Sequence, residues 1–246
     1  MTEEKKYPYL DAMPWEFYQG HIFTEVGTED VLDNPIERQR VEVIKHWVGT
    51  GKKVLDLASC WGGISNEIRE NGNDVTILDM PDVIAKAKEL HPKLKFLEGS
   101  VLNIPTDEQY DVIVASEIME HILDLDRFFS EIKRVLKKDG KLIITTPNMC
   151  RTFNIFALIY GNTNGFEYFG KPIIHCRHFT PSTLFLTLHK QGFKPLMYAG
   201  TETGAGNNLE GFTDEEKEMF NKLLEKFVPE KEYRASLMCV LAEIEQ

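Results

Sequence analysis

The sequence predicts an α/β protein with a mostly parallel sheet and helices on both faces of that sheet. Short apolar runs alternate with amphipathic helical runs between residues 53 and 145, and strands that alternate with helices in this way form parallel sheets. The chain has 246 residues, of which 42% are hydrophobic and 27% charged. This length is enough for one α/β domain with a sizeable hydrophobic core and too short for two such domains.

The N-terminal part of the chain is expected to cover the main domain. Residues 1–33 are rich in aromatic side chains but follow no clean period, so we interpret them as a cover segment over a single domain that spans residues 34–246. The first helix of this domain should begin at Pro35, with Asn34 as its N-cap, because proline suits the first helical position. It should continue to about Val48, where two glycines follow.

Seven runs have the length and composition of strands, and helical runs separate most of them. The strands are predicted at residues 53–57, 75–78, 94–97, 111–115, 142–145, 193–198 and 236–244. The helices between and after them are predicted at residues 63–70, from Pro81 to the His91-Pro92 stop, at 126–136, from Thr180-Pro181 to Gly192, and from Thr213 onward.

The regular alternation stops after Pro147. Residues 148–179 form a long connection with a predicted helix at 153–160 and a stretch rich in glycine and asparagine. Connections of this length in compact domains are usually functional. We therefore expect an insertion that covers the substrate.

Charge and cysteine content exclude several classes of protein. A net charge of −11 disfavours a nucleic-acid partner, since phosphate binding needs clustered lysine and arginine. No run has the composition of a secretion signal or the length of a membrane span, so no membrane partner is expected. The four cysteines have neither paired nor zinc-like spacing. We expect reduced thiols in a cytoplasmic protein.

The turn after the strand at 53–57 is the first candidate site. It lies where a strand ends and a helix begins, which is the edge where open α/β sheets bind ligands. Of the three positions that are glycine in phosphate-binding turns, only Gly62 is glycine, and Ala58 and Cys60 occupy the others. The helix N-terminus could bind a carboxylate. Asp79, roughly 20 residues farther on, has the spacing of a carboxylate that accepts ribose hydroxyls.

Three further segments carry a family resemblance. Residues 110–124, 128–140 and 142–148, in this order and spacing, closely resemble class I S-adenosylmethionine-dependent methyltransferases, in particular the type 11 and ubiquinone-biosynthesis O-methyltransferases. The resemblance covers most of residues 40–200. It implies a Rossmann-like seven-stranded sheet with the last strand antiparallel. It also implies that the protein methylates a small molecule, in the first place on a hydroxyl group, with S-adenosylmethionine as the methyl donor.

The same resemblance implies which residues bind the cofactor. The loop around the methionine part is matched by Asp56, Ala58, Ser59, Cys60 and Gly62. Asp79 matches the ribose carboxylate and Met80 the apolar neighbour of the adenine. Ser100 and Val101 match the segment beside the adenine ring, although relatives often have an acidic residue in place of Ser100. The end of the fourth strand, where cofactor and acceptor meet, is matched by Ser116 and Glu117.

A metal site is implied by three residues at positions i, i+3 and i+4. Glu117, Glu120 and His121 would share one face of a helical turn, and the ubiquinone-type and small-RNA methyltransferases bind a divalent ion with such a Glu-x-x-Glu-His. The RNA enzymes add a histidine that His175 matches in spacing better than His178, although both lie in the right segment. These four ligands would suit Mg²⁺, Mn²⁺ or Fe²⁺, which would lower the pKa of a bound hydroxyl. In many metal-free relatives the Glu-His pair only packs near the cofactor.

The candidate catalytic residues are His178 and His121. The unperturbed pKa of histidine lies near neutrality, which suits a general base, although His178 could also only pack within the insertion. Aromatic side chains that could line the acceptor pocket are Trp15, Phe17, Tyr18, Trp61 and Phe166.

Other functions are compatible with the same residues. The protein could methylate a nitrogen or carbon atom of a small molecule, such as an amino sugar, without a metal. The altered glycine loop would also fit a non-catalytic protein that binds the cofactor. RNA methylation is opposed by the charge of −11.

Overall fold

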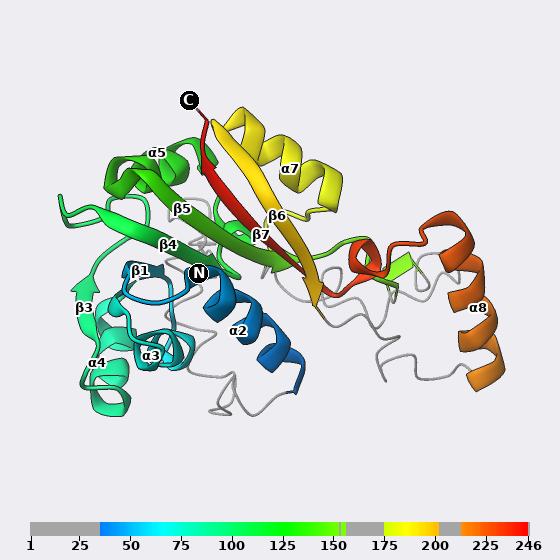
Figure 1. Ribbon diagram of the computed structural model, residues 1–246, viewed down its shortest axis with the longest axis horizontal. Helices are drawn as coiled ribbons and strands as arrows, with labels where there is room; N and C mark the ends of the chain where they lie inside the picture. Colours follow the sequence, from blue (N-terminus) through cyan, green and yellow to red (C-terminus); the bar gives the residue numbers. More distant parts are fainter. Residues whose placement is uncertain (1–34, 153, 156–174, 202–212, 246) are drawn as a thin grey trace, which may run out of the picture.

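The computed structural model describes residues 35–152, 154–155, 175–201 and 213–245 (Figure 1). Several predictions lie outside these residues: the cover segment 1–33 with its aromatic side chains, the N-cap Asn34, Phe166, and the helix at 153–160 apart from its described positions. The domain boundaries and the insertion at 148–179 therefore stay predictions.

One seven-stranded sheet forms the centre of the protein, with the strand order β3-β2-β1-β4-β5-β7-β6. Neighbours among β1 to β5 pair in parallel, whereas β7 pairs antiparallel with both β5 and β6. The predicted seven-stranded sheet with its last strand antiparallel is confirmed. The strands are β1 (Lys53–Leu57), β2 (Asp74–Asp79), β3 (Lys95–Glu98), β4 (Tyr110–Ser116), β5 (Leu136–Pro147), β6 (Phe193–Thr201) and β7 (Leu237–Ile244).

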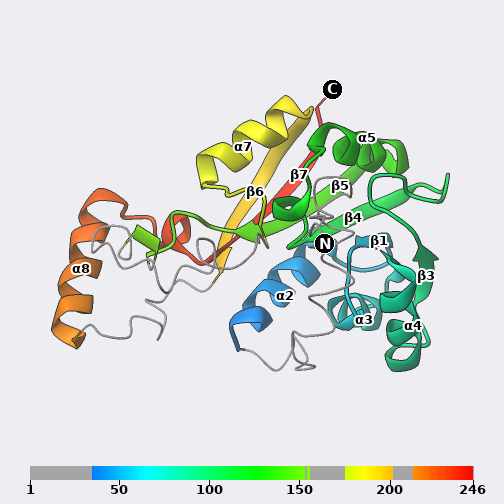
Figure 2. The same cartoon turned by 180° about the vertical axis from the view of Figure 1, so that it is seen from behind.

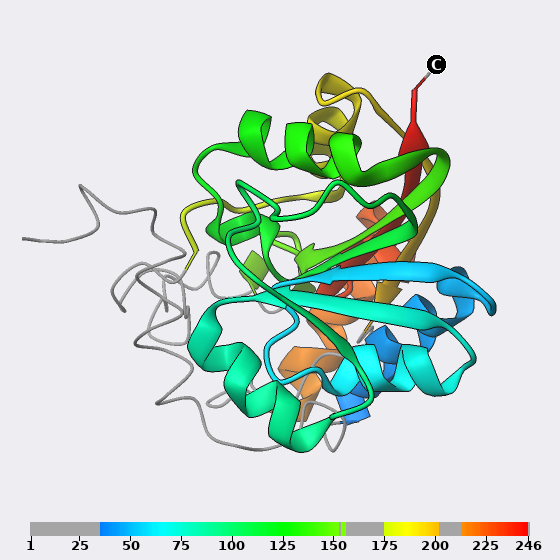
Figure 3. The same cartoon turned by 90° about the vertical axis from the view of Figure 1, so that its left-hand side faces the viewer.

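Helices cover both faces of the sheet (Figure 3). One face packs against α2 (Pro35–Val48), α3 (Gly63–Glu70) and α4 (Pro81–Leu90), and the other against α5 (Leu125–Val135) and α7 (Pro181–Lys190). Successive residues of a strand point to opposite faces, so Val54 joins the core under α2 and Leu55 the core under α5. Both are fully buried.

The boundary between α5 and β5 differs from the prediction. The helix was expected at 126–136 and the strand at 142–145, but β5 begins at Leu136, directly after α5. Leu136 pairs with Tyr110 of β4, and the register shifts before Val112 pairs with Lys141. The polar residues between Leu136 and Lys141 give no strand signal. Pairing with β4 extends β5 to Leu136, and the local sequence carries no information about this pairing.

Three elements lie outside these layers: η3 (Met119–His121), α8 (Asp214–Phe227) and η4 (Lys231–Arg234). Seen from opposite sides, Figures 1 and 2 both place α8 at the end of the molecule away from α4. Among the described helices, none combines the length and apolar composition needed to cross a bilayer.

The parallel strands bring the predicted site residues to one edge of the sheet. β1, β2, β4 and β5 are neighbours that run in the same direction, so their carboxyl ends meet there. Asp56 is the second-last residue of β1, Asp79 is the last residue of β2, and Glu117 directly follows β4. The sheet therefore brings these three residues to one edge, next to the end of β5. Asp56 and Glu117, the two that are farthest apart in the sequence, are 61 positions apart.

Candidate active site

The loop from β1 to α3 has an unusual backbone. Ala58 has φ 55°, Cys60 has φ 52° and Gly62, the N-cap of α3, has φ 84°. These left-handed conformations suit glycine and cost about 1–2 kcal/mol in other residues. Ala58 and Cys60 thus replace the expected glycines and still adopt the glycine conformation. Among the described residues, the only other non-glycine residue with positive φ is Glu117, and such strain clusters at functional sites.

Hydrogen bonds from β2 hold this loop in place. The amide of Ala58 donates to the carbonyl of Leu78 at 2.8 Å, and the amide of Cys60 donates to Oδ2 of Asp79 at 3.0 Å. Within the loop, the amide of Gly62 donates to the carbonyl of Ser59 at 3.0 Å. The Ser59 hydroxyl is buried and has no hydrogen-bond partner among the described residues. A bound ligand would satisfy such a group.

Asp79 links the loop to the start of α4. Its Oδ1 accepts the amide of Met80 at 2.8 Å and its Oδ2 the amide of Cys60, while only 1% of the residue is exposed. A carboxylate oxygen can accept more than one hydrogen bond. The carboxylate therefore orients the loop at the position where the contact to ribose hydroxyls is predicted.

Asp56 is buried beneath the same loop. Its Oδ2 accepts the hydroxyl of Ser65 at 2.5 Å. Burial and the negative charge of Asp79 raise the pKa of Asp56 to about 7, against the opposing effects of Ser65 and Arg40. A positively charged ligand at the loop would favour the ionised form of this carboxyl group.

The predicted adenine side lies around the end of β3. Ser100 is half-buried, and its hydroxyl accepts the amide of Leu102 at 3.1 Å. Val101 is fully buried, and Met80 packs against the same core. Two apolar side chains, Met80 and Val101, therefore lie close to the end of β2. Ser100 occupies the position at which relatives often have an acidic residue, so no carboxylate is present there.

The structure corrects the predicted helical turn at Glu117. The turn η3 begins only at Met119, and Glu117 has φ 55°, so Glu117 does not share a helical face with Glu120 and His121. Its amide donates to the carbonyl of Thr145 at 3.0 Å, and its Oε1 accepts the Thr145 hydroxyl at 2.8 Å. The hydroxyls of Thr145 and Ser116 also lie 2.8 Å apart. These contacts tie the end of β4 to β5.

Arg40 is a site residue that the sequence analysis missed. Its Nη1 lies 3.5 Å from Oε1 of Glu117, and its side chain is only 7% exposed. Arg40 lies on the face of α2 that also buries Val41, Ile44 and Val48. A charged residue within the apolar face of a helix is an informative signal, and it could have identified Arg40.

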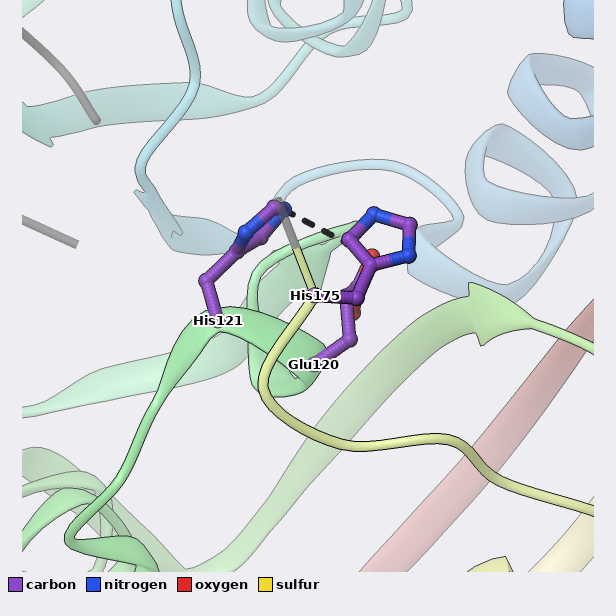
Figure 4. Close-up of side chains that lie close together, drawn as sticks. All are labelled: Glu120, His121 and His175. Carbon is purple, nitrogen blue, oxygen red and sulfur yellow. Dashed lines mark ion pairs between the residues drawn. The ribbon is translucent and has the colours of Figure 1, made fainter. Parts of the chain in front are cut away.

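The structure brings together three of the four predicted metal ligands (Figure 4). Glu120, His121 and His175 each offer one ligand atom, and these atoms all lie within 4.8 Å of one another. Oε1 of Glu120 lies 4.0 Å from Nε2 of His121, and the rings of His121 and His175 have centroids 4.7 Å apart. Glu117 does not belong to this group of described residues. His175 reaches it although 54 positions separate it from His121 in the chain.

The electrostatics of the group suit a cation. Oε2 of Glu120 accepts the Thr146 hydroxyl at 2.9 Å, whereas its buried Oε1 has no hydrogen-bond partner among the described residues. Burial and the charge of Glu117 raise the pKa of Glu120. Burial lowers the pKa of His175 to about 3, and so do the positive charge of Arg151 and any positive charge on His121 and His178. A neutral imidazole and an oxygen without a hydrogen-bond partner are donor types that divalent ions use, and a bound cation would displace the proton that burial favours on Glu120.

His178 lies at the same site but in a different setting. It is exposed, and its ring centroid lies 6.5 Å from that of His175. Desolvation of part of the ring lowers its pKa. A small pocket between the ends of β5 and η3 is lined by Glu120, Pro147, Met149, His175, Arg177 and His178. Of the aromatic residues predicted to line the acceptor pocket, Trp61 is the one that lies among the described residues. It is half-buried in the loop from β1 to α3.

Comparison with known proteins identifies the family. Residues 55–144 match the family model described as "Methyltransferase domain", and this match spans the loop from β1 to α3, the end of β4 and η3. The chain contains a class I, S-adenosylmethionine-dependent methyltransferase domain.

Two curated relatives of this methyltransferase domain are ubiquinone biosynthesis O-methyltransferases. That of Rickettsia conorii is 26% identical over 135 residues, which are 49% of this chain and 47% of the relative. The mitochondrial protein of Bos taurus is 31% identical over 165 residues, which are 61% of this chain and 44% of the relative. The chain thus spans about half the length of these relatives.

A solved structure supports the fold of the methyltransferase. The N-methyltransferase NodS of Bradyrhizobium japonicum, in complex with S-adenosyl-L-homocysteine, superposes with a TM-score of 0.62 at 14% identity. The superposition covers 93% of this chain and 98% of NodS. The predicted Rossmann-like fold is therefore confirmed for the described residues.

Proposed function

We propose that the protein transfers the methyl group of S-adenosylmethionine to a hydroxyl group of a small molecule, and that the hydroxyl binds at Glu120, His121 and His175. The observation that carries this proposal is the buried Oε1 of Glu120, which lacks a hydrogen-bond partner among the described residues and lies 4.0 Å from Nε2 of His121. The names of the two curated relatives, both O-methyltransferases, support a hydroxyl acceptor.

The cofactor would occupy the carboxyl edge of β1 and β2. The strained loop around Ala58 and Cys60 would hold the methionine part, with the unsatisfied hydroxyl of Ser59 as one donor. Asp79 would accept ribose hydroxyls. The apolar neighbours Met80 and Val101, with Ser100, would lie beside the adenine. Ser116 and Glu117 would lie where cofactor and acceptor meet.

Arg40 would recognise the amino-acid end of the cofactor. It is a buried cation next to Glu117, and its charge also acts on Asp56 below the cofactor loop. Methionine carries a carboxylate and an ammonium group at this end. An arginine beside a glutamate offers a partner of the opposite sign to each of them.

The acceptor side needs alignment and a way to remove a proton. Methyl transfer is an in-line displacement, so the protein must hold the acceptor oxygen against the methyl group and exclude water. A divalent ion such as Mg²⁺, Mn²⁺ or Fe²⁺, held by Glu120, His121 and His175, would lower the pKa of the acceptor hydroxyl. Burial keeps His175 neutral near pH 7, so its ring nitrogen can act as a ligand. Without a metal, His121 or His178, which lies at the pocket rim, would act as the general base.

The test uses labelled S-adenosylmethionine and a panel of small hydroxyl and amine acceptors. We expect a hydroxyl acceptor to be methylated, EDTA to abolish turnover, and added Mn²⁺ to restore it. Full turnover in EDTA would overturn the metal but not the methyl transfer. Methylation of amines only would indicate N-methylation. If calorimetry detects no binding of S-adenosylmethionine or S-adenosylhomocysteine, the proposed enzyme activity is wrong.

A further inference from the structure

A short segment presents His175 to the other two side chains of the group. We call residues 175–178 the histidine strap. The amides of Cys176 and Arg177 both donate to the carbonyl of Glu120, at 3.0 and 3.1 Å. The thiol of Cys176 lies 3.2 Å from the same oxygen. The strap is thus bound to the main chain of the residue whose carboxylate faces His121.

The side chain of Arg177 makes a second attachment. Its Nε donates to the carbonyl of Ile122 at 2.9 Å and its Nη2 to the carbonyl of Leu123 at 2.6 Å. Both carbonyls directly follow η3. A guanidinium can bind two acceptors at once because its donors form a planar fork. The main-chain amide and the side chain of Arg177 therefore both form hydrogen bonds to the segment from Glu120 to Leu123.

Arg177 differs from other arginines of the protein in its partners. Among the described residues it forms no ion pair with a carboxylate and uses main-chain carbonyls instead. Arginines that do pair with a carboxylate are Arg38, Arg40, Arg69, Arg127, Arg134 and Arg234. A cation that binds only the backbone of a catalytic turn is best explained by a role in fixing the geometry of that turn.

The other end of the strap is fixed as well. The residue after His178, Phe179, accepts the amide of Met149 at 2.7 Å through its carbonyl and forms a parallel bridge with Asn148. The strap is therefore held against η3 by Arg177 and against the end of β5 by Phe179. His175 lies on the far side of the Arg177 attachment, so Phe179 alone does not determine its position.

We propose that Arg177 is a positioning residue that holds His175 against Glu120 and His121. The inference rests on the proposed function of these three side chains. Supports of this kind around a metal ligand typically change metal affinity by 10–100-fold when they are removed. Without the fork of Arg177, only the bonds to the carbonyl of Glu120 would hold the strap against η3, and His175 would leave its place beside His121.

The test compares Arg177→Gln and Arg177→Lys with Arg127→Gln as the matched control. Arg127 also donates its Nε to a main-chain carbonyl, that of Leu102 at 2.8 Å, on another part of the surface. Binding of Mn²⁺ alone is measured by electron paramagnetic resonance, and exchange of the Cys176 and Arg177 amides is measured by hydrogen–deuterium exchange. The affinity for S-adenosylmethionine is measured by calorimetry.

We expect Arg177→Gln to weaken Mn²⁺ binding about 10–100-fold and to expose both strap amides, with unchanged cofactor affinity. Arg177→Lys should recover part of the Mn²⁺ affinity, since lysine can reach one carbonyl but has no planar fork. Arg127→Gln should leave all three measurements unchanged. Wild-type Mn²⁺ affinity and protected amides in Arg177→Gln would overturn the inference.

Failure of the proposed function gives a different result. If the wild-type protein binds no Mn²⁺, the proposed metal is wrong, and amide exchange then decides the role of Arg177. Exposed strap amides together with a lower kcat and an unchanged KM for S-adenosylmethionine would support the inference. Protected amides would overturn it. If Arg177→Gln does not fold, Arg177→Lys provides the same comparison.

Discussion

Nη1 of the buried Arg40 lies 3.5 Å from Oε1 of Glu117. Glu120, three residues farther along, instead lies 4.0 Å from Nε2 of His121. The two carboxylates were expected to share one helical face, but they have different neighbours. This separation leads to opposite predictions for the two residues.

Glu117→Gln should destabilise the protein and leave the metal ligands in place. The substitution removes the negative charge beside a buried guanidinium, and breaking a partly buried ion pair from one side costs roughly 2–4 kcal/mol. Chemical denaturation should show this loss. Mn²⁺ should still bind, because Glu117 is outside the ligand group, although the charge of Glu117 acts on Glu120 and its removal should shift the affinity. Loss of Mn²⁺ binding in Glu117→Gln would mean that Glu117 is a ligand after all.

Glu120→Gln should have the opposite effect. Burial raises the pKa of Glu120, which means that its ionised form is costly in the folded protein. A neutral amide of similar shape removes this cost, so we expect the metal-free variant to be at least as stable as wild type in thermal unfolding. We also expect Mn²⁺ binding and turnover to be lost. The matched control is Glu108→Gln, an exposed carboxylate paired with Lys53.

Stability should depend on pH through Asp56. Its pKa is about 7 in the folded protein, above the ordinary value of 3.8, so the folded state binds the proton more tightly than the unfolded state. Between about pH 4 and 7 the folded state therefore loses stability as pH rises, by as much as ~4 kcal/mol. Asp56→Asn cannot ionise. Its stability should therefore increase relative to wild type over this range.

Urea denaturation of both proteins at pH 5, 6, 7 and 8 measures this difference. Asp82→Asn, which changes an exposed carboxyl group of α4, is the control. It keeps Asp56, so its stability should fall with rising pH as that of wild type does. A constant difference between Asp56→Asn and wild type from pH 5 to 8 would contradict the burial of an uncharged Asp56. Bound S-adenosylmethionine should reduce the drift in wild type, because its positive charges favour the ionised carboxyl group.

Ala58→Gly should stabilise the protein. Ala58 has φ 55°, a conformation that costs alanine about 1–2 kcal/mol and glycine nothing, while the extra freedom of glycine in the unfolded chain costs about 0.5–1 kcal/mol. A net gain of about 0.5 kcal/mol is expected on these values, seen as a higher denaturation midpoint. Ala87→Gly, in the middle of helix α4, is the matched control and should lose about 1 kcal/mol or more. Equal losses in both variants would refute strain at Ala58.

Local patterns in the sequence were sufficient for most of the fold. Alternating strand and helix signals predicted seven strands with nearly correct positions, because each strand and helix carries its own periodicity and end signals. The error at the start of β5 has a tertiary cause: Leu136 is part of the strand because it pairs with Tyr110. The strand propensities of the polar residues after Leu136 carry no information about that pairing.

The candidate site was predictable in its members but not in their roles. The motif from Glu117 to His121 predicted a turn here, and the structure has a turn at Met119–His121 that leaves out Glu117. Arg40 was missed because its partner, Glu117, is 77 positions away. The segment that carries His175 was chosen by resemblance, whereas its attachment through Arg177 to Ile122 and Leu123 has no sequence signal.

The sequence by itself determined the α/β class and the side chains available for chemistry, and it predicted which loop binds the cofactor, because these depend on periodicity and on motifs within a few turns of chain. The tertiary structure decided that Glu117 faces Arg40 and that His175 joins Glu120 and His121. These relationships depend on strand pairing and on hydrogen bonds between distant segments. Their geometry is fixed only when the carboxyl ends of β1, β4 and β5 come together in the folded sheet.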